Sequence, residues 1–278
     1  MKSIRSAILL ALSTLALASL HAGEYSNDFD SYANGATDLG DGTTLVDGYA
    51  TPVVEVYSTG SWQALRLTQD QYEGDSGYGQ LILPDLDPGV AVTGFTASFD
   101  LLLKSEDGSN ADGFSLNFGD IDTGTVTDFE DGFARNDGDM LTLSFDTYDN
   151  GSGDVFGRVT AYLNDTEIPG GDTGPNADIH IGSTLDGSNY REVIMSWNTT
   201  DGFSVSYGGN SIYSNQAIAF NPEAGSIFGL AGRTGGADQD TFIDNTQIVT
   251  VPEVGSGLLA SLALGATALF SLLRRKGR

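Results

Sequence analysis

The chain has 278 residues, no cysteine and a formal net charge of −26 at pH 7. Between residues 23 and 251 only six basic residues stand against 37 acidic ones, so phosphate backbones are repelled and a nucleic-acid partner is excluded. Without cysteine, neither a disulfide framework nor a cysteine-based metal site can form. The fold must therefore rest on its hydrophobic core, and the chain is long enough to build one.

Residues 1–22 have the pattern of an export signal. Lys2 and Arg5 precede an uncharged apolar run, which is the order of a positive and a hydrophobic region in a signal peptide. Cleavage is expected after Ala22, where the polar chain opens, although residues 16–18 offer a second small-residue site. A first transmembrane anchor is the alternative.

Residues 23–250 predict one all-β domain. Apolar and polar residues alternate over short segments, which is typical of strands with one buried face. The clearest segments are 95–103, 114–118, 141–145, 159–163, 193–197, 203–207 and 242–249. Clusters of Gly, Asp, Asn and Ser between them indicate turns. Many short strands joined by such turns favour a β-sandwich or jelly roll.

Three motifs in this domain resemble the L-type (legume-like) lectins. They are Ala111-Asp112-Gly113 at a strand start, Phe145-Asp146-Thr147-Tyr148-Asp149-Asn150 in a loop, and the glycine-rich segment 229–236 followed by 242–245. The resemblance implies a concanavalin A-like jelly-roll β-sandwich that binds carbohydrate without catalysis. It also implies that Asp112, Gly113 and Asn150 contact the sugar, with Asp112 following a non-proline cis peptide.

The loop from Asp146 to Asp154 is a candidate calcium site. Calcium takes six to eight oxygen ligands, and the loop offers Asp146, the Tyr148 carbonyl, Asn150 and Asp154. The resemblance implies Ca²⁺ at these positions. Ser144 stands where the family has the glutamate of a second, transition-metal ion, and His180 is expected to be a polar residue at a strand end. A plain Asx-rich hairpin turn remains the alternative for the loop.

The sequence gives little support for catalysis. A glycosidase needs two carboxylates facing each other across the scissile bond, and the Glu-x-Asp-x-x-Glu string of laminarinase-like relatives of this fold does not occur. Beyond the export signal His180 is the only histidine, so a nucleophilic triad has little to draw on. A non-enzyme is predicted, with a glycoside hydrolase as the least favoured alternative.

Residues 251–278 have the organisation of a sorting signal. Twenty uncharged residues, 254–273, could form about 30 Å of helix, enough to cross a bilayer core. A buried core helix is the alternative, but it would show a polar face. The segment resembles the PEP-CTERM sorting signal, although Val254 replaces the usual second proline. The motif residues are Val251, Pro252, Glu253, Arg274 and Arg275.

That resemblance implies recognition by an exosortase-type sorting enzyme at the inner membrane. The basic end is expected to stay cytoplasmic. Together the patterns predict an exported protein of the cell surface or extracellular matrix that binds an exopolysaccharide. A structural or adhesive matrix protein without a sugar site is the main alternative.

Overall fold

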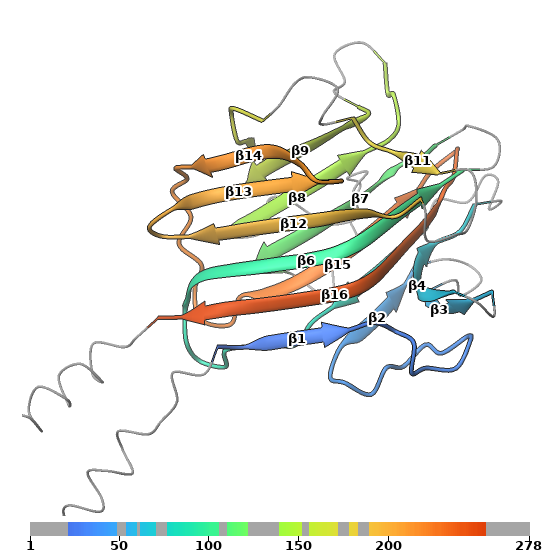
Figure 1. The fold of residues 1–278 in the computed structure, drawn as a ribbon, viewed down its shortest axis with the longest axis horizontal. Helices are drawn as coiled ribbons and strands as arrows, with labels where there is room; N and C mark the ends of the chain where they lie inside the picture. Colours follow the sequence, from blue (N-terminus) through green and yellow to red (C-terminus); the bar gives the residue numbers. More distant parts are fainter. Residues whose placement is uncertain are drawn as a thin grey trace, which may run out of the picture.

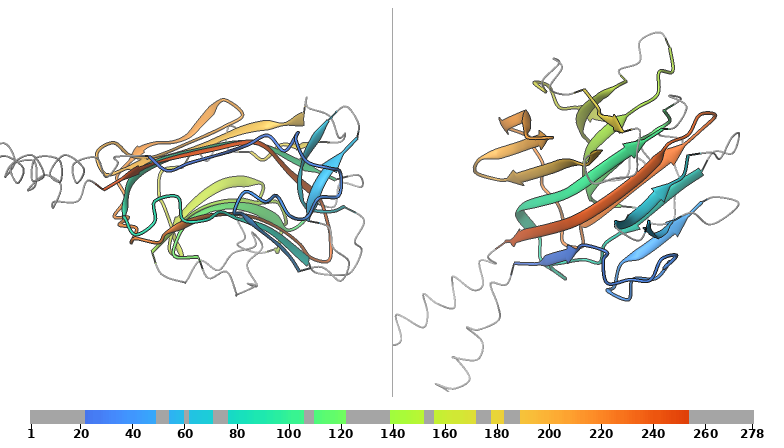
Figure 2. Two further views of the ribbon diagram at one scale, coloured as in Figure 1. Left: turned by 90° about the horizontal axis from the view of Figure 1, so that it is seen from below. Right: turned by 45° about the vertical axis from the view of Figure 1, so that its right-hand side comes forward.

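The computed structural model describes residues 22–48, 54–59, 62–70, 77–105, 110–121, 139–151, 156–171, 178–182 and 189–253. These residues form strands in two facing sheets (Figures 1 and 2), which confirms the predicted all-β class. Within them, no helix is long and apolar enough to cross a membrane. The predicted transmembrane segment, Arg274 and Arg275 lie outside the described residues.

The first sheet has nine strands, in the order β14-β13-β12-β6-β16-β4-β3, with β1 beside β16 and β11 beside β6. All pairings are antiparallel except the short parallel contact between β11 and β6. Its strands are β1 (Glu24–Asn27), β3 (Glu55–Ser58), β4 (Gln63–Thr68), β6 (Val92–Lys104), β11 (Ile181–Gly182), β12 (Arg191–Asn198), β13 (Gly202–Tyr207), β14 (Asn210–Gln216) and β16 (Asp240–Pro252).

The second sheet has seven antiparallel strands in the order β10-β9-β8-β7-β15-β5-β2. They are β2 (Thr44–Asp47), β5 (Gly77–Ile82), β7 (Gly113–Gly119), β8 (Met140–Asp146), β9 (Arg158–Leu163), β10 (Thr166–Glu167) and β15 (Ile227–Thr234). The left view of Figure 2 shows the two sheets as separate layers.

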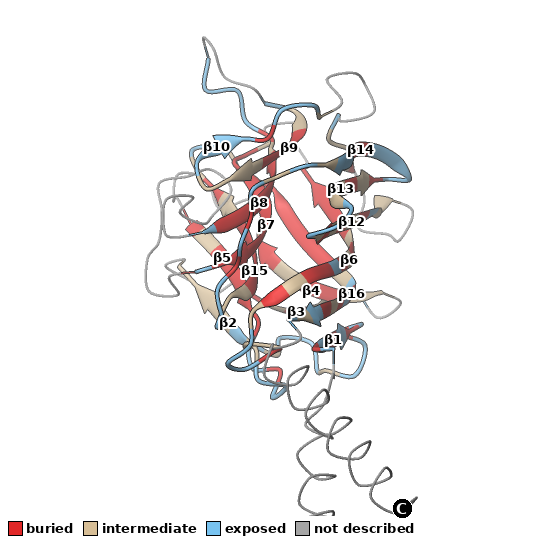
Figure 3. Cartoon of the chain, turned by 90° about the vertical axis from the view of Figure 1, so that its left-hand side faces the viewer, coloured by how far each residue is buried: buried red, intermediate tan, exposed pale blue. Residues whose placement is uncertain are grey.

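The core between the sheets is built by the inward side of the predicted alternation. Phe95 of β6 packs edge-on against Phe118 of β7, with 4.9 Å between ring centroids. Phe118 stacks on Phe228 of β15, with 4.3 Å between centroids. All three side chains are buried, as the red interior in Figure 3 illustrates. Burying one such side chain contributes roughly 1.5–3 kcal/mol, and the contact between Phe95 and Phe118 joins the two sheets.

A smaller aromatic cluster lies on the outer face of the nine-stranded sheet. The ring centroid of Phe242 in β16 is 5.0 Å from that of Trp62, which it meets edge-on, and 5.6 Å from that of Tyr57. The ring centroids of Trp62 and Tyr190 are 5.8 Å apart. Tryptophan and tyrosine on a strand surface could also stack on sugar rings. Here they pack on one another and on strand neighbours, which is ordinary strand packing.

The first and last strands lie side by side. Glu24 of β1 pairs with Val249 of β16, and the two strands are adjacent in Figure 1. Val251 and Pro252, which the sequence predicts to belong to a sorting motif, are the last two residues of β16, and the Glu253 amide donates to the Ala91 carbonyl at 2.7 Å. The sandwich therefore extends to Glu253.

Carboxylates gather where β6 and β16 pair on the outer face. Asp100 lies opposite Asp244, and Asn245 donates its backbone amide to Asp244 at 2.7 Å and its side-chain amide to Asp100 at 2.9 Å. Burial, followed by repulsion from Asp30, Asp100 and Asp28, raises the pKa of Asp244 from 3.8 to about 6. The folded state therefore holds this proton more tightly than the unfolded chain.

The raised pKa of Asp244 predicts that the free energy of unfolding decreases as pH rises from 4 to 7. Because protonated Asp244 is favoured in the folded state, its contribution to the free energy of unfolding is fully present below about pH 4. This contribution is lost as pH rises through about 6, where the folded protein releases the proton. Asp244→Asn should therefore match the wild type at pH 4 and exceed it at pH 7.5, by about 1–2 kcal/mol after allowing for solvent screening. Urea melts at both pH values test this, with the exposed Asp38→Asn as control. Equal wild-type and Asp244→Asn curves at pH 7.5 would contradict it.

Candidate functional site

Asp112 stands at the start of β7, where three strands of the seven-stranded sheet meet. Its amide donates to the Arg233 carbonyl of β15 at 2.8 Å, and its carbonyl accepts from the Thr147 amide, just after β8, at 2.9 Å. The Ala111–Asp112 peptide is cis, as the lectin resemblance implies. Gly113 pairs with Asp146 on one side and with Arg233 on the other. The structure thus brings the Ala-Asp-Gly motif and the Asp146 loop together at one edge.

The Asp112 carboxylate is buried at this edge. The residue is 6% exposed, and Arg233 Nε is 3.4 Å from Asp112 Oδ2. A β-carbon at Gly235 would lie 2.6 Å from Asp112 Oδ1, so a side chain at this position would displace the carboxylate. The carboxylate is therefore held between an arginine and a glycine backbone.

Arg233 has an unsatisfied N–H donor group and lies beside the Asp112 carboxylate. Its side chain is 20% exposed, and its Nη1 is buried with no hydrogen-bond partner among the described residues. A guanidinium has five N–H donors in a fixed plane, so part of its capacity is unused. The pair with Asp112 compensates the charge of the carboxylate.

Hydrogen bonds from the interior of the sandwich fix the backbone of the site. The Thr147 hydroxyl lies 3.0 Å from the Asp112 carbonyl oxygen and 2.9 Å from Gln239 Oε1. The Thr68 hydroxyl, at the end of β4, donates to the Gln239 carbonyl at 2.7 Å. Because Gln239 and Thr68 are fully buried, this network joins the site to the nine-stranded sheet behind it.

The described part of the predicted calcium loop forms Asx turns. Asp146 Oδ1 accepts from the Tyr148 amide at 3.2 Å, and Asp149 Oδ1 accepts from the Gly151 amide at 2.8 Å. Tyr148 is 38% exposed and Asn150 is also exposed. Asp154 lies outside the described residues. Within the described ranges no three acidic or histidine side chains converge on a metal position.

His180 directly precedes β11, as the predicted strand-end residue. Its amide donates to the Tyr207 hydroxyl at 3.0 Å. Burial, with a further contribution from the charge of Arg191, lowers the pKa of His180 below its usual value. The neighbouring Ile179 amide donates to the Gly157 carbonyl at 3.0 Å, which places this segment beside the start of β9.

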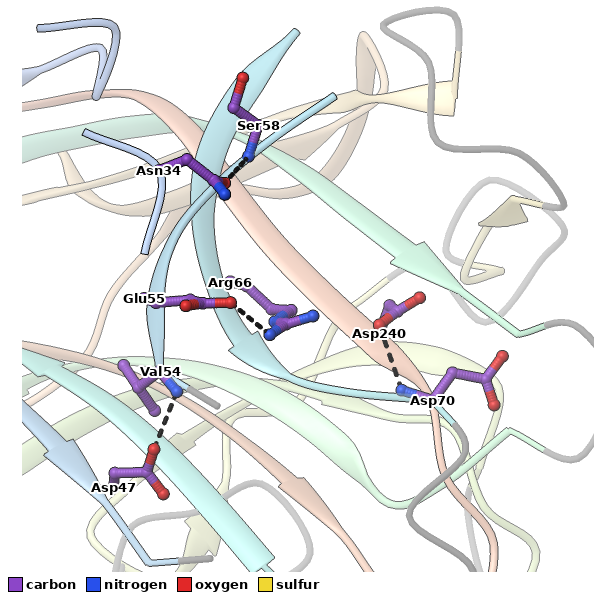
Figure 4. Close-up of polar contacts among 8 residues, drawn as sticks. All are labelled: Asn34, Asp47, Val54, Glu55, Ser58, Arg66, Asp70 and Asp240. Carbon is purple, nitrogen blue, oxygen red and sulfur yellow. Dashed lines mark hydrogen bonds and ion pairs between the residues drawn. The ribbon is translucent and has the colours of Figure 1, made fainter. Parts of the chain in front are cut away.

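A buried charge cluster lies at the same end of the sandwich. Lys104 Nζ, at the end of β6, is 3.2 Å from Asp240 Oδ2 and 3.9 Å from Asp70 Oδ2. The Asp70 amide also donates to Asp240 Oδ1 at 3.1 Å (Figure 4). Burial raises the pKa of Asp240, and the Asp70 amide and Lys104 partly offset this. Lys104 therefore compensates two carboxylates in a dry environment.

The sequence patterns do not predict Arg233, Thr147 or Gln239 as site residues. Arg233 carries the one available signal, because it is a rare basic residue inside a motif of the lectin resemblance. Thr147 and Gln239 act through contacts that form only when the two sheets meet. Their roles could not be inferred from local sequence.

Comparison with known proteins rests on structure alone. No protein-family model and no curated protein sequence matches the chain. The Emp46p carbohydrate recognition domain, potassium-bound form, aligns with a TM-score of 0.55 at 15% identity, over 83% of this chain and 98% of that one. The chain has the concanavalin A-like lectin fold. The predicted β-sandwich is thereby confirmed.

Two further lectin structures share this fold. The basic winged bean lectin with Tn-antigen has a TM-score of 0.55 at 12% identity, covering 84% of this chain and 99% of that one. The VIP36 exoplasmic/lumenal domain in its Ca²⁺/Man3GlcNAc-bound form has a TM-score of 0.50 at 12% identity, covering 84% and 89%. At such identities the likeness establishes the lectin fold and leaves the site to be argued from its own residues.

Proposed function

We propose that this protein is a non-catalytic carbohydrate-binding protein that contacts sugar at the Asp112 edge. The observation that carries the proposal is the placing of Asp112, whose backbone is fixed by β15 and by Thr147, at the edge where Thr147 leads into the exposed residues Tyr148 and Asn150. The lectin fold supports it, since VIP36 and the winged bean lectin are described with bound sugars.

Each group at this edge has a definite role in the proposed site. Asp112 accepts hydrogen bonds from two sugar hydroxyls, and Asn150 donates one. Hydrogen bonds to a charged acceptor contribute roughly 1.5–3 kcal/mol each. Tyr148 offers its ring to the apolar C–H face of a sugar. Arg233 compensates the charge of Asp112, and Gly113 is the third residue of the proposed contact.

We further propose that the ligand is an exopolysaccharide at the cell surface or in the matrix. A glycan array, run with and without EDTA, tests binding directly, and specific glycan binding is the expected result. Release of reducing sugars from bound polysaccharides would instead indicate a glycoside hydrolase.

A second candidate function is a structural or adhesive matrix protein. The specific observation that favours it is the low exposure of Asp112, 6%, together with its ion pair to Arg233. In that case the pair only stabilises the edge. An array without specific binding, in either calcium or EDTA, would support this candidate.

Calcium is proposed as the ion that orders the Asp146 loop. Asp146, the Tyr148 carbonyl, Asn150 and Asp154 would hold it, and it would fix Asn150 for sugar contact. The expected gain in stability is about 2.7 kcal/mol at a calcium concentration one hundred times the dissociation constant. Melting curves in millimolar calcium and in EDTA measure this gain. Superimposable curves would favour the plain Asx turn.

The tail is proposed to anchor the protein at the inner membrane before an exosortase-type enzyme sorts it. Because Glu253 still bonds to the sandwich, a clean deletion begins at Val254 and ends at Arg278. The truncated protein should appear in the medium, whereas the full chain should fractionate with the envelope. Immunoblots of both fractions decide this, and equal cell association of the two forms would show that the tail is not the anchor.

A further inference from the structure

The start of the described chain is built into the sandwich. The Gly23 amide donates to Asp87 Oδ1 at 3.2 Å, and the Gly23 carbonyl accepts from the Thr250 amide of β16 at 2.9 Å. The Thr250 hydroxyl also bonds to Asp87 Oδ2. Gly23 is buried and Asp87 is 7% exposed. Residue 23 is thus held on both its amide and its carbonyl side.

Only glycine fits at this position. A β-carbon on Gly23 would lie 2.5 Å from the Leu86 carbonyl oxygen and 2.7 Å from the Leu86 β-carbon. Backbone atoms cannot move aside as the end of a flexible side chain can. Any side chain at position 23 would therefore clash with Leu86.

Asp87 presents a buried charge without a matching cation. Among the described residues, no lysine, arginine or histidine lies within ion-pair distance of its carboxylate. Its carboxylate partners are the Gly23 amide and the Thr250 hydroxyl, both neutral donors. A buried carboxylate is costly unless a positive charge compensates it.

We infer that the chain is cleaved between Ala22 and Gly23 and that the new α-ammonium of Gly23 forms a buried ion pair with Asp87. This inference rests on the proposed export of the protein. A signal peptidase would hydrolyse the Ala22–Gly23 bond with water, leaving a carboxylate on Ala22 and an amine on Gly23. At neutral pH that amine takes up a proton beside the carboxylate that already accepts from its nitrogen.

Removal of the signal would then change the charge at the start of the sandwich. In the uncleaved chain the Gly23 nitrogen is a neutral amide, whereas in the cleaved chain it carries the compensating charge. The ion pair anchors β1, which pairs with β16 from Glu24 to Asn27. Removal of the signal would thus strengthen the attachment of the first strand to the last.

The test uses the processed protein recovered from exporting cells. N-terminal sequencing should give Gly23 as the first residue. Acetylation of the α-amine in urea at pH 6.5, where the unfolded chain exposes it and its pKa lies below that of lysine, followed by refolding and mass spectrometry, should lower the melting temperature by about 3–10 °C. Lys104 and Lys276 are the only lysines after Gly23, so side reactions are easily located. In Asp87→Asn, acetylation should change the melting temperature by less than a degree, while the exposed control Asp38→Asn should respond like the wild type.

A pH series provides a readout that needs no variant. An α-amine whose pKa is raised by a folded-state partner contributes stability below about pH 8 and loses it as pH rises through the higher folded value. The unmodified protein should therefore lose melting temperature above pH 8, and the acetylated protein should not show this loss.

The outcomes separate this inference from the proposed export. Absence of the protein from the envelope and the medium would overturn the proposed export. A retained signal in exported protein would overturn the cleavage and the ion pair alone, and a first residue other than Gly23 would overturn the cleavage position. A Gly23 start with equal effects of acetylation in wild type and Asp87→Asn would overturn the ion pair alone. None of these results depends on glycan binding.

Discussion

Asp112→Ala is expected to weaken glycan binding at least tenfold. The substitution removes the carboxylate that would accept two sugar hydroxyls, and each such bond is worth roughly 1.5–3 kcal/mol, where 1.4 kcal/mol is a factor of ten in affinity. Isothermal titration with a glycan identified on the array measures the change. Asp112→Asn should fall between wild type and alanine, because it retains one acceptor oxygen and loses the charge.

Stability must be measured alongside affinity, because Asp112 also pairs with Arg233. Glu55→Ala is the matched control. It breaks the pair between Glu55 and Arg66 on the outer face of the other sheet (Figure 4), so it should leave glycan affinity unchanged. An unchanged affinity in folded Asp112→Ala would remove Asp112 from the site. A loss of stability, with no glycan binding in either form, would support the structural candidate.

Lys104→Met is expected to be the most destabilising single substitution proposed. It leaves the Asp70 and Asp240 carboxylates buried without the cation that lies between them. Breaking a buried pair by removing one partner typically costs about 3–5 kcal/mol, which should lower the melting temperature by about 10 °C in a domain of this size. The deficit should shrink as pH falls, because protonation then neutralises the remaining carboxylates.

The compensated variant distinguishes charge from packing. Lys104→Met combined with Asp70→Asn and Asp240→Asn removes all three charges and keeps the oxygen that accepts from the Asp70 amide. It should recover most of the lost stability. Glu55→Ala, at a pair whose side chains are 11% and 27% exposed, is the comparison at a less buried ion pair and should cost clearly less than Lys104→Met. A triple variant as unstable as Lys104→Met would show that packing around Lys104 matters more than its charge.

Local sequence predicts those strands that have one buried and one exposed face. In β12 and β13 the burial alternates residue by residue, and both were found from alternation alone. In β4, Ala64 and Leu65 are both buried, because the outer aromatic cluster covers the second face. Alternation is lost there, so this strand carries no clear signal. β1 has only four residues and acquires strand geometry by pairing with β16.

The candidate site was predictable to the extent that it depends on neighbouring strands of one sheet. Motif resemblance and antiparallel order place Asp112 and the Asp146 loop at the same edge, and the register of β7 with β8 agrees. The pairing of Arg233 with Asp112 depends on the register of β7 with β15, which sequence spacing does not fix. The contact of Thr147 with Gln239 requires the two sheets to be assembled, and those of Lys104 depend on how β6, β16 and β4 pair within the nine-stranded sheet, so local patterns give no signal for them.

The course of β16 has a mechanical consequence. This strand begins at Asp240, a few residues after Arg233, and ends at Pro252 beside the proposed membrane tail. Over its 13 residues it spans roughly 40 Å. It is paired along much of this length with β6, near its start with β4, and from residue 246 to residue 249 with β1. Tension between a bound matrix polymer and the envelope would run along the strand axis. Its hydrogen bonds would then be sheared together rather than unzipped one by one, so the domain would resist being pulled apart.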